Sequence, residues 1–280
     1  IANGKLKGEI VDYTTKLAKA LKVKGIINIQ YVHFEDNLYV IEVNPRSSRT
    51  VPFLSKVTGI PMINLATKAS LGYKLKDLGY SSGLYPEPSY VTVKAPVFSF
   101  AKLMQLETSL GPEMKSTGES IGMDKSLSKA LYKALVAAGC VVPPQGNILA
   151  TVADKDKDEA LPLLKCYQEI GFKLYATKGT AAFLQKAGLE VQKVNKIGEG
   201  SPHVADIIKE GKIDLVINTL TKGKNPQRDG FKIRRAAVEN NLPCLTSLDT
   251  AGALLEVMKN FRKGEALHID SLQDYLKTIK

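Results

Sequence analysis

The stretch 41–49, Ile-Glu-Val-Asn-Pro-Arg-Ser-Ser-Arg, concentrates side chains that could bind a metal ion and phosphate. Glu42 and Asn44 are two residues apart, and such residues share a face in a β-strand. A carboxylate and amide oxygens suit a hard cation such as Mg²⁺, which keeps its other positions for water and phosphate oxygens. Arg46 and Arg49 follow on the next turn, where they could meet phosphate. The stretch therefore indicates metal-assisted phosphate chemistry.

A hairpin would add Gln30 as a third ligand. The runs 25–34 and 38–43 are rich in β-forming residues and flank a good turn sequence, which predicts an antiparallel hairpin. If Asp36 is its centre, residue 34 faces 38 and Gln30 lies directly opposite Glu42. The neighbouring positions are apolar, so we expect a half-buried element in which unpartnered polar groups would cost a few kcal/mol each.

A structural alternative explains the same residues without a metal. Glu42 could pair with Arg46 or Arg49 at the end of the strand, while Gln30 and Asn44 bond to backbone. Geometry alone leaves the two interpretations about equally supported.

Strands and helices alternate regularly in the second half of the chain, after a linker at 139–146. This alternation is typical of an α/β domain with a parallel sheet that is covered on both faces. The pattern predicts strands at 147–153, 172–176, 191–194, 213–218 and 243–246, and helices near 157–170, 179–187, 203–211, 230–240 and 249–260. Earlier helices are expected at 4–24, 61–78 and 124–138, with a short strand at 90–94.

Polar residues follow several of the predicted parallel strands. Ligands collect at the carboxyl ends of such strands, where helix N-termini offer unpaired amides. Lysines supply charge and threonines supply hydroxyl donors, so the set predicts a site for a phosphate monoester, although each residue singly could be a cap or a surface side chain. The set is Lys157, Thr177, Thr180, Lys196, Asn218 and Thr219.

Composition limits the other classes of function. The 280 residues carry a net charge of +11, but the basic excess is spread over both halves and there is no Trp, which argues against nucleic acid. The three cysteines lack metal-ligand spacing and predict a reducing, cytoplasmic setting. No apolar run approaches the ~20 residues of a membrane span. The chain begins with Ile1 rather than Met, so we expect it to be part of something larger.

Two motifs resemble one known family. The end of an ATP-grasp domain is resembled by Gln30 together with Ile-Glu-Val-Asn-Pro-Arg-Ser-Ser-Arg-Thr-Val-Pro-Phe (41–53). The segment between the ATP-grasp and regulatory domains is resembled by Gly-Pro-Glu-Met-Lys-Ser-Thr-Gly-Glu (111–119). Both are similar to the large subunit of carbamoyl-phosphate synthetase, a ligase that makes carbamoyl phosphate from ATP, bicarbonate and ammonia from glutamine. The resemblance implies a partial ATP-grasp domain at 1–140, with antiparallel β-structure and helices, and a Rossmann-type, methylglyoxal-synthase-like allosteric domain at 141–280.

The resemblance also implies roles for the candidate residues. Glu42 would bridge two Mg²⁺ or Mn²⁺ ions on the ATP phosphates, Gln30 and Asn44 would be further ligands, and Arg46 and Arg49 would stabilise phosphoryl transfer as catalytic residues. In the second domain, Lys157, Thr177, Thr180 and Lys196 would hold an effector phosphate, with Asn218 and Thr219 near the base or ribose. The full-length protein would bind ATP and a glutaminase small subunit, and the resemblance allows K⁺ and an oligomer.

Departures from the family pattern bear on the effector. Ala95 and Cys244 stand where ornithine-responsive relatives carry a glutamate and a tyrosine, which argues against ornithine. The basic insertion 221–228 resembles that of pyrimidine-dedicated enzymes, inhibited by UMP and activated by phosphoribosyl pyrophosphate, and Lys222, Lys224 or Arg228 could help to hold the effector. A shared role in arginine and pyrimidine biosynthesis stays open.

Two alternative functions remain. The chain could be a stand-alone module that senses nucleoside monophosphates. It could also be a methylglyoxal synthase, but Ser201 stands where that enzyme needs a catalytic aspartate.

We expect the purified 280-residue chain to make no carbamoyl phosphate by itself, because the resemblance requires a first ATP site and upstream parts of the second. A coupled assay with ATP, bicarbonate and ammonia measures this, and turnover above background would contradict the expectation.

Overall fold

The computed structural model describes residues 4–100, 113–140, 142–220, 229–262 and 267–277. They form two compact units, Ile1–Ser89 with Ile269–Lys280, and Tyr90–His268. The domain boundary that we predicted between 140 and 141 lies inside the second unit and stays a prediction about family domains.

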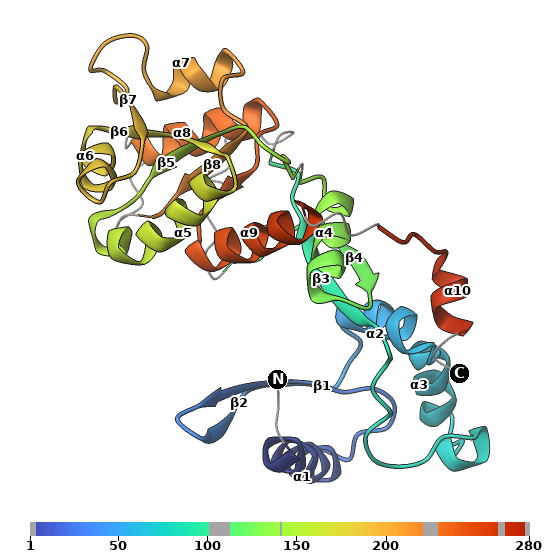
Figure 1. Cartoon of the computed structure of the whole chain (residues 1–280). Helices are drawn as coiled ribbons and strands as arrows, with labels where there is room; N and C mark the ends of the chain where they lie inside the picture. The colour runs from blue at the N-terminus through green and yellow to red at the C-terminus, as the bar shows by residue number, and fades with distance from the viewer. Residues whose placement is uncertain (1–3, 101–112, 141, 221–228, 263–266, 278–280) are drawn as a thin grey trace. The chain divides into compact units, whose positions relative to one another are not determined.

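The first unit contains a two-stranded sheet and several helices (Figure 1). Its elements are α1 (Gly4–Ala20), β1 (Asn28–Phe34), β2 (Asn37–Asn44), α2 (Thr50–Thr58), α3 (Met62–Ser70), a 3₁₀ turn (Leu75–Leu78) and α10 (Leu272–Lys277). The single helix predicted over 61–78 is therefore wrong: α3 ends at Ser70, and Gly72 follows with a φ of +97°, a conformation that glycine adopts without strain.

The hairpin of β1 and β2 has the predicted pair but a different turn. Gln30 lies opposite Glu42 as expected, whereas Phe34 faces Asn37 rather than residue 38. Glu35 and Asp36 have φ values of +47° and +60°, as in a two-residue turn of the type that suits the twist of a hairpin. A bulge beside Gln30 then inserts one extra residue into β2 and restores the predicted pair.

The expectation that this hairpin is half-buried is wrong for the described structure. Tyr39 and Ile41 are 51% and 61% exposed, and Leu38 is the one position of β2 that is buried. Burial of polar groups therefore gives no argument for a ligand at this hairpin.

The second unit begins with another antiparallel pair, β3 (Val91–Val97) and β4 (Gly118–Asp124), covered by α4 (Leu127–Ala137). The sequence patterns predicted β3 and α4 but not β4. Gly122 of β4 explains the close approach of the helix, because a Cβ built there would lie 1.9 Å from the carbonyl oxygen of Ala130. The N-terminus of α4 is capped by Ser126, whose hydroxyl accepts from the Lys129 N–H.

The rest of the second unit is a five-stranded parallel sheet in the order β7-β6-β5-β8-β9. Its alternation of strands and helices confirms the predicted α/β architecture, with ends that differ by a few residues. The elements are β5 (Asn147–Thr151), α5 (Lys157–Glu169), β6 (Lys173–Thr177), α6 (Lys178–Lys186), β7 (Val191–Val194), α7 (Val204–Lys209), β8 (Leu215–Asn218), α8 (Asp229–Glu239), β9 (Cys244–Leu245) and α9 (Leu248–Arg262).

Helices cover both faces of this sheet (Figure 1). Ile148 and Ala150 of β5 point into a core with α5 and α9, and Leu149 between them points into a core with α7 and α8. All three side chains are fully buried. A parallel sheet that is apolar on both faces leaves only its strand ends for polar chemistry.

No helix among the described residues is long and apolar enough to cross a lipid bilayer.

We expect Gly122→Ala to destabilise the second unit by about 1–3 kcal/mol, because the new methyl group would overlap backbone atoms of α4 at Ala130 and Ala134. Gly118→Ala in the same strand is the matched control, since its methyl group would meet its nearest neighbour at an ordinary 3.7 Å. Urea denaturation followed by circular dichroism measures both. Equal stability of the two variants would contradict the close packing of α4 on β4.

Candidate anion-binding pocket

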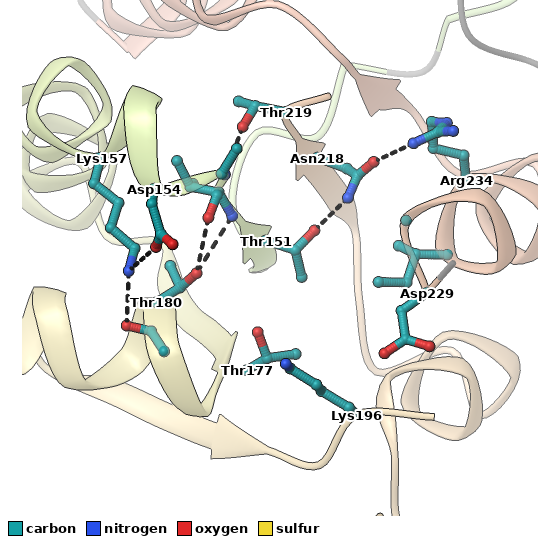
Figure 2. A pocket seen from close by; sticks show the side chains of 15 residues that line it. Thr151, Asp154, Lys157, Thr177, Thr180, Lys196, Asn218, Thr219, Asp229 and Arg234 are labelled. Atoms are coloured by element: carbon teal, nitrogen blue, oxygen red, sulfur yellow. Dashed lines mark hydrogen bonds and ion pairs between the residues drawn. The ribbon is translucent and has the colours of Figure 1, made fainter. Parts of the chain in front are cut away.

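An open pocket of about 220 Å³ lies at the carboxyl ends of β5, β6 and β8 (Figure 2). All six residues that we predicted for a phosphate site line it. It is also lined by residues that the sequence analysis missed, above all Thr151, Asp154, Asp229 and Arg234. The structure thus brings the predicted set together at one sheet edge.

Lys157 is the first residue of α5 and supplies a largely buried positive charge to the pocket. Its Nζ lies 2.6 Å from an Asp154 carboxylate oxygen and donates to the Gly179 carbonyl at 3.3 Å. The same ammonium group stands 5.7 Å from the centre of the Phe183 ring. Ring, carbonyl and carboxylate together hold the lysine head at the start of α6.

The N-terminus of α6 provides backbone donors. Thr177 ends β6 and is the N-cap residue of α6, and its side chain makes no capping hydrogen bond. The first amides of a helix lack partners within the helix and carry a partial positive charge, so this end favours an anion. Gly179 lies in this first turn, and a Cβ built there would meet the Lys157 Nζ at an ordinary 4.0 Å.

The Thr180 and Thr219 hydroxyls accept hydrogen bonds from backbone amides in the described pocket. Thr180 accepts a hydrogen bond from the Val152 N–H at 3.3 Å, and Thr219 accepts one from the Ala153 N–H at 2.8 Å. Both threonines are buried. They satisfy the two backbone amides that follow β5 and so hold the connection that leads to Lys157.

Asn218 is also engaged within the protein. Its amide donates to the Thr151 hydroxyl at 2.6 Å and accepts from the Arg234 guanidinium at 2.8 Å (Figure 2). Asn218 is only 3% exposed. The amide nitrogen and the amide oxygen thus both have partners within the protein. The predicted contact of Asn218 with a base or ribose stays a prediction.

Sequence reasoning missed Arg234, which is buried in α8. Arginine in the middle of an amphipathic helix gives no signal by itself, and only the packing of α8 on the sheet brings it to Asn218. Asp229, at the start of α8, stands on the opposite side of the pocket from Lys157 (Figure 2). It places a carboxylate across the pocket from Lys157.

Lys196 is exposed and follows β7 at the rim of the pocket. The hydrogen bond and charge of Lys157, with a smaller contribution from the Lys196 charge, hold the pKa of Asp154 below its usual value. Lys157 is therefore the main positive group that acts on this exposed carboxylate.

The three predicted metal ligands also come together, in the first unit. Gln30 and Asn44 each donate a side-chain N–H to the same Glu42 carboxylate oxygen, both at 2.8 Å. The alternative in which the two amides bond to backbone and an arginine pairs with Glu42 is not what the described residues form. Arg46 donates to the Ser47 carbonyl, and Arg49 directly precedes α2.

Among the described residues, no group of three or more His, Cys, Asp and Glu side chains is placed to hold a metal ion. The Glu42 cluster differs from such groups because two of its three members are amides. Turning either amide by half a rotation presents its oxygen in place of its nitrogen, so the donor set fits Mg²⁺ or Mn²⁺.

Ser201 and His203 have structural partners at the start of α7. His203 is the N-cap residue of α7, and its Nδ1 accepts from the Asp206 N–H. The Ser201 hydroxyl donates to the Asp206 carboxylate at 2.9 Å. These contacts describe a capped helix and give no sign of a general base at Ser201.

The other predicted effector residues are placed only in part. Ala95 is buried in β3, and burial raises the pKa of the Cys244 thiol in β9 to about 12. Neither observation tests the response to ornithine. Lys222, Lys224 and Arg228 lie outside the described residues, as do the first two residues of the 111–119 motif.

The geometry defines an α/β domain with a candidate anion-binding pocket, joined to a helical unit with a carboxylate–amide cluster. Comparison with protein families gives the class a name. Residues 4–78 match the ATP-binding domain of the carbamoyl-phosphate synthase L chain, and residues 159–246 match the MGS-like domain. The two matches, in this order, confirm the resemblance to the C-terminal part of a carbamoyl-phosphate synthase large chain.

Two solved structures are similar to part of the chain. Methylglyoxal synthase from Elizabethkingia anophelis NUHP1 shares 21% identity over 41% of this chain and 79% of its own, with a TM-score of 0.35. The structure of ForH shares 20% identity over 48% and 90%, with a TM-score of 0.32. Neither likeness is close enough to carry a functional argument.

We expect Thr180→Val to lower the free energy of unfolding by about 1–2 kcal/mol, because the buried Val152 amide loses its acceptor. Thr180→Ser keeps the hydroxyl and should retain most of the stability. Urea denaturation compares the two variants with the unchanged protein. If valine were tolerated as well as serine, the hydroxyl would have no part in holding the connection after β5.

Proposed function

We propose that this chain is the effector-binding end of a glutamine-dependent carbamoyl-phosphate synthase large subunit and that its pocket binds a nucleotide effector by its phosphate. The observation that carries the proposal is the convergence of Lys157, Lys196 and the N-terminus of α6 on one pocket. Two cations and a helix N-terminus together form an electrostatic environment suited to a phosphate monoester.

The charged side chains around the pocket suggest how a nucleotide would be oriented in it. The phosphate would lie at the lysine end, against the amides that begin α6 and beside the Thr177 hydroxyl. The Asp229 carboxylate across the pocket would repel phosphate but can accept hydrogen bonds, so it suits the ribose hydroxyls of a nucleotide. UMP as inhibitor and phosphoribosyl pyrophosphate as activator are the effectors that we propose, on the basis of the pyrimidine-type resemblance.

The hairpin cluster would serve the ATP site of the whole enzyme. Gln30, Glu42 and Asn44 would hold Mg²⁺ or Mn²⁺, which when bound neutralises charge on the ATP phosphates. The chain's own contribution is to keep the three side chains together on one face of the hairpin. The two amides do this by donating hydrogen bonds to Glu42. Arg46 and Arg49, both exposed on the following segment, would contact the transferred phosphoryl group.

The remaining features of the whole enzyme are part of the same proposal. They are a glutaminase small subunit, a cytoplasmic setting, K⁺ binding and assembly into an oligomer. The inactivity of the 280-residue chain by itself also stays a prediction.

A second candidate is a module that senses nucleoside monophosphates without catalysis. It is favoured by one observation, that the described residues lining the pocket all belong to the second unit. The pocket would then bind the same ligands in either case. Methylglyoxal synthase is disfavoured because Ser201 bonds to Asp206 of the helix cap.

We expect UMP to bind the purified chain and Lys196→Ala to weaken the binding about tenfold, since a charge-assisted contact to phosphate would be lost. Lys193→Ala is the matched control, because Lys193 is an exposed lysine of β7, the strand that Lys196 follows, and does not line the pocket. Isothermal titration calorimetry measures all three proteins. Absence of heat with the unchanged chain, or equal losses in the two variants, would refute the assigned site.

A further inference from the structure

Asp154 is a carboxylate that lines the pocket beside Lys157, where we propose that a phosphate binds. It belongs to a 3₁₀ turn, Asp154–Asp156, between β5 and α5, and its side chain is 95% exposed. Its carboxylate lies 2.6 Å from the Nζ of Lys157, whose side chain is only 17% exposed. The carboxylate is thus the exposed partner of a largely buried lysine.

The two partners are held very differently. Lys157 also contacts the Gly179 carbonyl and the Phe183 ring, so its ammonium group would stay in place without Asp154. For Asp154, the ion pair with Lys157 is the one direct side-chain contact among the described residues, and Lys196 acts on it only as a more distant charge. An exposed carboxylate with a single partner can rotate into water at little cost, because water replaces most of what it leaves.

A phosphate at the N-terminus of α6 would compete for the same side of Lys157. Carboxylate and phosphate carry like charge, and both cannot share one ammonium group at hydrogen-bond distance without repulsion. Phosphate brings about −1.5 to −2 charges at neutral pH and can also accept from the helix amides, which Asp154 does not do. The exchange therefore favours phosphate while leaving the lysine paired before and after.

We propose that Asp154 is a displaceable counterion of the effector pocket: it neutralises Lys157 in the free protein, leaves the lysine when the effector phosphate binds, and so lowers the affinity for effector. This inference rests on the proposed binding of a phosphate at this pocket. It makes Asp154 a residue that tunes the effector concentration at which the domain responds.

The test compares Asp154→Asn with the unchanged chain by calorimetry, using UMP and inorganic phosphate as probes. Because the lysine no longer has to be released, the variant should bind both probes about 2- to 5-fold more tightly, the range expected for an exposed ion pair. Asp158→Asn is the matched control, since it removes the same charge from an exposed position in the first turn of α5 that does not line the pocket. It should leave both affinities unchanged.

A second pair of variants separates release of Lys157 from simple repulsion. In a Lys157→Gln background there is no ammonium group to release, so adding Asp154→Asn should give no further gain in affinity. A gain that persists in this background, a gain of equal size in Asp158→Asn, or unchanged or weaker binding in Asp154→Asn would overturn the counterion role. If the unchanged chain binds UMP but Asp154→Asn binds no better, this inference fails alone. If neither protein binds either probe, the proposed function fails together with it.

Discussion

The pocket depends on how the chain leaves β5. The strand is buried on both faces, and its last backbone amides would have no acceptor if the connection to α5 were free to move. Two threonine hydroxyls supply the acceptors, Thr180 from α6 for Val152 and Thr219 from the end of β8 for Ala153. An unsatisfied buried amide costs on the order of 1–3 kcal/mol, so these bonds define the path of the segment that carries Asp154 and Lys157.

Charged and polar side chains surround that connection. Lys157 and Lys196 both line the pocket, Asp229 stands across from Lys157, and Asn218 is held between Thr151 and Arg234. Thr180, Thr219 and Asn218 are engaged in hydrogen bonds within the protein, whereas Lys196 is exposed and the Thr177 side chain makes no capping hydrogen bond. A ligand would therefore meet buried side chains that are already hydrogen-bonded and, at the rim, the exposed Lys196.

Sequence patterns predicted much of this because several local signals agree. The alternation of apolar strands with helices predicted the α/β sheet, and the polar residues after its strands predicted which side chains would meet, since parallel strands end at one edge. The pairing of Gln30 with Glu42 was also predicted, but from a wrong turn. The Glu35-Asp36 turn shifts the register by one residue, and a bulge in β2 shifts it back. Two compensating irregularities of this kind leave no trace in hydrophobic periodicity.

What the sequence by itself determined is the order of the elements, the kinds of chemistry at the strand ends and the family in which that combination occurs. Those properties follow from residue types and short spacings. The tertiary structure decided which polar groups are free to act: it engaged Thr180, Thr219 and Asn218 in internal hydrogen bonds, brought Arg234 to Asn218, and set Asp154 against Lys157. The reason is that a hydrogen bond or an ion pair depends on distances of about 3 Å. Residues far apart in the chain reach such distances only after helices have packed on both faces of the sheet.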